Sequence, residues 1–93
     1  MISKEEILEY TKKNNEIKDL YEDYKKTECL LRNGNEPELE KHMKSIFAKY
    51  FVEAQIYNIV HPQLPSTVQQ NALNCMDFLF TKIEEKIAEI ATV

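Results

Sequence analysis

The sequence predicts an all-α protein, and three observations lead to this fold class. The single glycine and the three prolines fall in two short segments, 33–37 and 61–65. Outside these segments, apolar residues recur every three or four positions, as in α-helices that bury one face. The length of 93 residues suits one domain. We therefore expect a single domain over residues 1–93, an antiparallel up-down-up bundle of three long helices that a second copy could complete.

The first helix is expected over residues 3–32. Ser3 can cap its amino end, with Glu6 reaching back to the cap amide. Gly34 can take the left-handed conformation that ends a helix. Lys13 and Thr27 interrupt one apolar column, so we expect packing along a narrow seam. The residues of that seam are Tyr10, Ile17, Tyr24 and Leu31, flanked by Ile7, Leu20 and Tyr21.

The second helix is expected over residues 36–60. Asn35 is a good cap residue, and Pro37 fits the first turn, where a helix needs no amide donor. The helix should end near Val60, because the position before Pro62 disfavours helical angles. Its inward face is the strongest amphipathic pattern of the chain: Leu39, Met43, Ile46, Phe47, Tyr50, Ala54 and Tyr57.

The third helix is expected over residues 66–91, with Ser66 as its cap and Gln69 completing a capping box. Short connections between helices favour antiparallel neighbours, which gives the up-down-up order. The inward face of this helix is Ala72, Leu73, Met76, Leu79, Phe80, Ile83, Ile87, Ile90 and Ala91.

Several large apolar residues lie opposite these inward faces, in the same half of the expected bundle. A homodimer through this patch is the interpretation that we favour, because symmetric self-association is a common way to bury such a surface. Two alternatives stay open: the patch is interior to a flat three-helix layer, or it contacts a different protein. Ile56 and Phe78 are the expected anchors. The predicted interface is Leu8, Val52, Ile56, Ile59 and Phe78.

Charge and hydropathy exclude two classes of partner. Sixteen acidic residues against twelve basic ones give a net charge of -4, and Arg32 is the single arginine, so we expect no nucleic-acid binding. No apolar run reaches the roughly 20 residues of a membrane span, and the amino end has no signal-peptide pattern, so we expect a cytoplasmic protein. The preference for lysine over arginine is typical of low-GC genomes and indicates a bacterial or phage origin.

The candidate chemical residues do not form a catalytic or metal-binding pattern. His42 and His61 lack metal-ligand spacing, and His42 is expected on the helix surface. Cys29 and Cys75 should be reduced and, in an up-down-up bundle, more than roughly 20 Å apart. We expect no enzyme activity, metal or cofactor.

The sequence therefore predicts a protein that acts by protein–protein interaction, as an adaptor, inhibitor, chaperone or immunity-type factor. If the apolar patch forms a dimer, the functional contact is expected on the acidic, tyrosine-bearing side of helix 3–32. The alternative is a ligand-binding bundle with an aromatic interior cavity. That cavity would be formed by Tyr24, Phe47, Tyr50 and Phe80.

Overall fold

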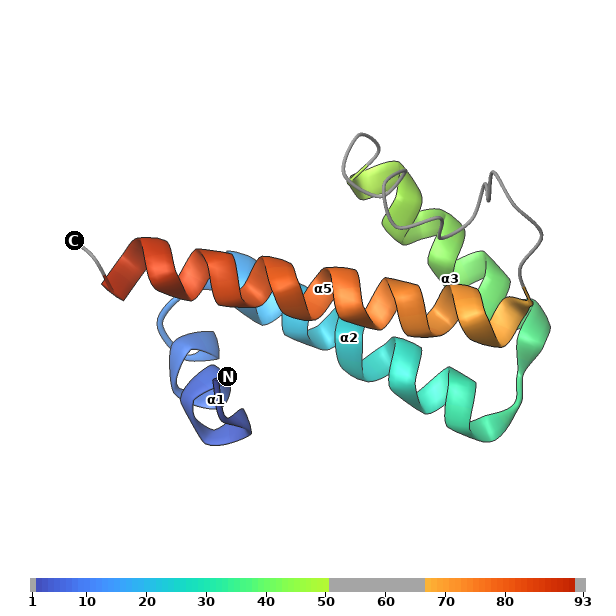
Figure 1. Ribbon diagram of the computed structural model, residues 1–93, viewed down its shortest axis with the longest axis horizontal. Helices are drawn as coiled ribbons and strands as arrows, with labels where there is room; N and C mark the ends of the chain where they lie inside the picture. The colour runs from blue at the N-terminus through green and yellow to red at the C-terminus, as the bar shows by residue number, and fades with distance from the viewer. Residues whose placement is uncertain (1, 51–66, 92–93) are drawn as a thin grey trace.

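The computed structural model describes residues 2–50 and 67–91, and its regular structure there is entirely helical. The helices are α1 (Lys4–Thr11), α2 (Asn15–Asn33), α3 (Glu36–Lys49) and α5 (Val68–Ala91), as Figure 1 shows. The predicted all-α class is confirmed. Within the described ranges, no helix combines the length and the apolarity that a membrane crossing requires.

The expected continuous helix 3–32 is wrong, because the chain turns at residues 12–14 and starts a new helix. The amides of Lys13 and Asn14 donate to the Tyr10 carbonyl, at 3.0 and 2.9 Å, and close α1. Asn14 is extended (φ -140, ψ 119), and its Oδ1 accepts from the amide of Ile17 at 3.0 Å. This side chain therefore caps α2, and α1 packs against α2 instead of extending it.

Three other predicted helix ends, at Ser3, Gly34 and Asn35, agree closely with the structure. The Ser3 hydroxyl accepts from the Glu6 amide at 3.2 Å, and Gly34 is left-handed with φ 70. Asn35 caps α3 by accepting from the Glu38 amide at 3.4 Å. The cap of α5 is one residue later than expected: Thr67 Oγ1 accepts from the Gln70 amide at 3.1 Å. Residue 66, the expected cap, lies outside the described residues.

The up-down-up order is also wrong, because α5 runs antiparallel to α2 (Figure 1). Lys86 pairs with Glu16 at 2.9 Å, whereas Phe80 lies beside Tyr24 with ring centroids 6.0 Å apart. In the direction in which residue numbers increase along α2, they therefore decrease along α5. The expected order required one straight helix over 36–60. Instead α3 ends at Lys49, and Tyr50 (φ -123, ψ 47) has left helical geometry; residues 51–60 lie outside the described residues.

The core lies along the α2–α5 pair, with α1 and α3 on opposite sides of it (Figure 1). Of the inward face predicted for the second helix, Leu39, Met43, Ile46 and Phe47 are buried and Tyr50 is partly buried; Ala54 and Tyr57 lie outside the described residues. The buried face of α5 is rotated from the expected one, since Leu73 is 51% exposed whereas Phe78 is 2% exposed. The buried residues of α5 are Asn71, Ala72, Cys75, Phe78, Leu79, Ile83 and Ile87.

Candidate functional site

The candidate site is an open, largely apolar groove between α1, α2 and α5. It consists of two neighbouring hollows that share the rings of Tyr24 and Phe80. The first hollow has a volume of about 150 Å³ and also contacts Ile7 and Tyr21. The second has a volume of about 200 Å³ and reaches Met76. We call the two hollows together the aromatic groove; its apolar lining is Ile7, Tyr21, Tyr24, Met76 and Phe80.

Helix geometry explains how these side chains meet. Tyr21 and Tyr24 are three residues apart and therefore share one face of α2, where their rings stack with centroids 6.4 Å apart and planes 9° apart. The Phe80 ring of α5 lies at 51° to the Tyr24 ring. Ile7 is 2% exposed, so it fixes α1 against this aromatic face. The turn at residues 12–14 makes this contact possible.

The groove extends beyond the part that α1 covers. Helix α1 has 8 residues, about 12 Å, whereas α5 has 24 residues, about 36 Å. No residue of α1 lines the second hollow. Leu73, Met76 and Phe80 follow the spacing i, i+3, i+7 and so continue the apolar face along α5. At the uncovered end of this face, Leu73 has half of its surface in solvent.

Charged residues also line the groove. Lys4, Lys25 and Glu28 line the first hollow and Asp77 lines the second, and we call these four residues the charged rim. Burial raises the pKa of the Tyr24 hydroxyl, and the negative charge of Glu28 raises it further by a smaller amount. Tyr24 is therefore a neutral ring with a hydroxyl donor at physiological pH, which suits an apolar side chain with a polar neighbour.

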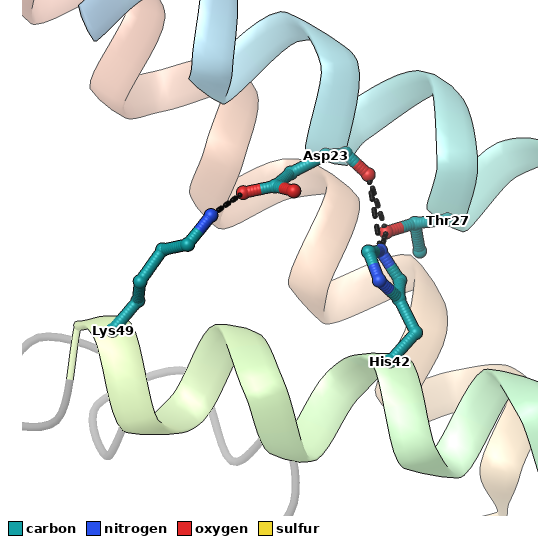
Figure 2. Close-up of polar contacts among 4 residues, drawn as sticks. All are labelled: Asp23, Thr27, His42 and Lys49. Carbon is teal, nitrogen blue, oxygen red and sulfur yellow. Dashed lines mark hydrogen bonds and ion pairs between the residues drawn. The ribbon is translucent and has the colours of Figure 1, made fainter.

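A second cluster of polar residues joins α2 to α3 (Figure 2). His42 Nε2 is 2.9 Å from Thr27 Oγ1 and 3.2 Å from the Asp23 carbonyl oxygen. The Thr27 hydroxyl donates to the same carbonyl at 2.8 Å, and Lys49 Nζ pairs with the Asp23 carboxylate at 2.7 Å. Asp23 therefore contacts α3 at two positions, two turns apart. We call Asp23, Thr27, His42 and Lys49 the polar cluster.

The polar cluster contradicts the expected surface position of His42, which is 8% exposed. A carbonyl oxygen can only accept, so the contact with Asp23 requires the proton of His42 to be on Nε2. Burial lowers the pKa of His42, against a smaller raising effect of the Asp23 carbonyl. A neutral imidazole with this little exposed surface suits a structural contact between helices better than proton transfer to a substrate.

Cys75 adjoins the same cluster and is also buried. Burial raises the pKa of its thiol to about 12, and the nearby Thr27 hydroxyl offsets this only in part. Such a thiol is a poor nucleophile. The proximity to Thr27 also overturns the expected separation of more than roughly 20 Å from Cys29, because antiparallel α5 brings Cys75 beside α2. Cys29 is exposed two positions beyond Thr27, on another side of the helix, and both cysteines are free.

A third hollow, of about 360 Å³, lies between α2, α3 and α5. Its lysines already have acidic or aromatic neighbours: Lys86 pairs with Glu16, and Lys82 lies 5.6 Å from the centre of the Tyr50 ring. Glu16 and Asp19 line the same hollow, and Lys49 pairs with Asp23, so acidic residues offset most of the lysine charge, which does not favour an anion site. Within residues 2–50 and 67–91, no group of three or more His, Cys, Asp and Glu is arranged to hold a metal ion.

The residues of the predicted dimer interface are not brought together in the described part of the chain. Leu8 is 41% exposed, but Phe78 is buried and packs edge to face on Tyr50, with centroids 5.6 Å apart. Phe78 therefore does not lie on the exposed face where the sequence placed it. The other three residues, Val52, Ile56 and Ile59, lie outside the described residues, so an interface through them stays a prediction.

The aromatic groove was missed because its residues were assigned to the bundle interior. Asn14 is the sequence signal that could have found it: an asparagine three residues before Ile17 can cap a new helix and let α1 fold back. Comparison of the chain with known protein families, curated proteins and solved structures finds no match. We therefore interpret the groove from its own geometry and chemistry.

Proposed function

We propose that this chain acts by binding another protein, with the aromatic groove as its binding surface. The observation that carries the proposal is a half-open hollow between three aromatic rings, continued by a leucine that is 51% exposed. Aromatic residues are enriched at protein interfaces, where rigid rings bury much surface at a small cost in conformational entropy. Both tyrosines lie on α2, which packs against each of the other described helices and so presents them on a rigid support.

Each hollow of the groove, taken singly, has a volume that suits an inserted side chain better than a drug-sized molecule. Sites for drug-sized ligands typically enclose about 300–1,000 Å³. The hollows of the groove, about 150 and 200 Å³, suit one large apolar side chain each. The four residues of the alternative ligand cavity also do not share one hollow: Tyr24 and Phe80 line the groove, whereas Tyr50 lines the hollow beside α3.

The predicted role follows from this surface. A partner would insert an apolar anchor between Tyr21, Tyr24 and Phe80, and its polar groups would meet the charged rim. Such binding suits an adaptor, inhibitor, chaperone or immunity-type factor, which needs no catalytic residues. We further propose that the protein works in the cytoplasm and that one of its partners is a second copy of itself.

A peptide selection tests the binding surface and does not require the partner to be identified first. Displayed random peptides are selected on the wild-type protein, and the enriched peptides are titrated by fluorescence anisotropy. We expect peptides with one large apolar residue, whose Kd rises about tenfold or more with Tyr24→Ala. Ile90→Ala is the matched control, because Ile90 is 40% exposed on α5 but does not line the groove. Enriched peptides that bind Tyr24→Ala as tightly as wild type would contradict the proposal.

A further inference from the structure

The two sides of the aromatic groove carry opposite charge. On α2, Lys25 and Arg32 are seven residues apart, with Glu28 between them and paired to both at 3.5 and 3.4 Å. This edge therefore has two positive charges against one negative charge. On α5, Asp77 and Glu84 are also seven residues apart, and Asp77 lines the second hollow. One edge is thus net basic, and the other is acidic.

The register between α2 and α5 places these charges at the same level. Tyr24 lies beside Phe80, and Thr27 lies near Cys75. Lys25 lies between Tyr24 and Thr27 on α2. Asp77 lies between Cys75 and Phe80 on α5. A line across the groove, perpendicular to the helices, therefore runs from a lysine to an aspartate.

This arrangement is self-complementary under one particular two-fold rotation. A second copy can be rotated by 180° about an axis parallel to α2 and α5, so that its groove faces the groove of the first copy. Each residue then keeps its position along the helix axis, and α5 of one copy lies over α2 of the other. Lys25 of each copy then meets Asp77 of the other. A two-fold axis across the helices would instead bring each aspartate toward its own equivalent, which costs free energy.

The same rotation pairs the apolar residues. Beyond the part of the groove that α1 covers, the strip Leu73, Met76 and Phe80 of one copy lies over the α2 side of the other, where Tyr24 and Leu31 are only partly buried. Antiparallel register sets Phe80 opposite Tyr24 and Leu73 opposite Leu31. The half-exposed Leu73 would thereby leave solvent, which favours the assembly.

We propose that the occupant of the aromatic groove is a second copy of this chain, which forms a two-fold dimer with α5 of each copy over α2 of the other. This inference rests on the proposed function, because it names the partner of the same surface. It differs from the interface expected from the sequence, which used Phe78 and residues outside the described ranges. Two Lys25–Asp77 pairs form per dimer, one on each side of the axis.

Charge reversal tests this geometry directly. The dimer dissociation constant is measured by sedimentation equilibrium for wild type, Lys25→Glu, Asp77→Lys and the double variant. Each single variant places like charges together twice per dimer, so we expect the dissociation constant to rise about tenfold or more. The double variant restores both pairs with reversed sign, and its dissociation constant should return to within about threefold of the wild-type value. Circular dichroism confirms that each variant is folded.

A matched apolar pair separates this surface from the rest of α5. Leu73→Lys should weaken the dimer strongly, whereas Ile90→Lys, at a similarly exposed position outside the groove, should leave it unchanged. A monomeric wild type at millimolar concentration would overturn the inference. A dimer dissociation constant that Leu73→Lys leaves unchanged would overturn it as well. A dissociation constant of the double variant as high as those of the single variants would have the same meaning. Peptide binding that Tyr24→Ala abolishes would still support the proposed function in each of these cases.

Discussion

His42 shows how one buried polar side chain links two helices and makes their contact sensitive to pH. Burial lowers its pKa in the folded protein, so the unfolded chain binds a proton more readily. The stability that this contact contributes is complete above the unfolded-state pKa, about 6.5, and is lost as the pH falls toward the lowered folded-state value. Lys26 and Lys49 oppose the added proton, and the Asp23 carboxylate favours it.

We therefore predict that the wild-type protein is less stable to urea at pH 5.5 than at pH 7.5. In His42→Gln, which retains an amide donor but does not titrate, this part of the pH dependence should be absent. His61 and all carboxylates are common to both proteins and cancel in the comparison. Equal pH dependence in the two proteins would show that His42 does not carry the effect.

The two cysteines should differ in reactivity. Cys29 is exposed, whereas Cys75 has no exposed surface and a pKa raised to about 12. We predict that iodoacetamide at pH 8 modifies one thiol per native chain and two per chain in urea, as counted by intact mass. Peptide mapping should place the native modification on Cys29. Rapid native labelling of Cys75 would mean that α5 separates readily from α2.

The position of His42 could be predicted from the sequence only in part. His42 belongs to the spacing Leu39, His42, Met43 and Ile46, which is the buried stripe of α3, so the pattern did contain its burial. The surface position that we expected for His42 rested only on the polarity of its side chain. Its partners on α2 lie 15 and 19 positions away, and no local spacing reveals such contacts.

At the scale of elements, the capping residues decide where each helix ends. Asn14 closes the turn between α1 and α2 through one side-chain hydrogen bond. Replacement of Asn14 by Ala should lower the free energy of unfolding by about 1 kcal/mol, whereas Asn14→Ser should cost much less because serine also caps helices. Chemical denaturation followed by circular dichroism measures both. Equal stability of Asn14→Ala and wild type would contradict a capped break.

Gly34 provides a test of backbone conformation without a packing effect. Its φ is 70, and a Cβ added there meets no atom within 4 Å. Gly34→Ala should therefore lower the free energy of unfolding by about 1–2 kcal/mol through the left-handed conformation alone. Gly34→Asn should cost less, because asparagine tolerates this region. The difference in urea midpoint between the two variants is the measurement, and identical midpoints would contradict the explanation.

These helix ends were predictable because capping depends on residues within one turn of each other. Ser3, Gly34 and Asn35 were all recognised in this way. The direction of α5 was not predictable, since it depends on how far α3 carries the chain. The rotation of its buried face was missed for a related reason: every third or fourth residue of α5 is apolar over a wide arc, and only the packing partners select Cys75 and Phe78 over Leu73.

At the scale of the whole molecule, the two sides of the α2–α5 pair are covered unequally. Helix α3 buries five residues against one side, whereas α1 contributes one buried residue, Ile7, to the other. A helix as short as α1 leaves apolar surface of α5 open, and such surfaces on folded proteins commonly mark interaction sites. The groove is thus a consequence of the turn at residues 12–14 and not of any single motif.

The central claim is that a second copy contacts the aromatic groove, and a dilution series followed by methyl NMR tests it most directly. Met76 lines the groove and Met43 is buried on the inward face of α3, so ¹³C-methyl methionine labelling gives a reporter and an internal control in one sample. We predict that dilution from millimolar to micromolar concentration shifts the Met76 signal and leaves the Met43 signal in place. A Met76 signal that stays constant while sedimentation shows the dimer dissociating would contradict the claim.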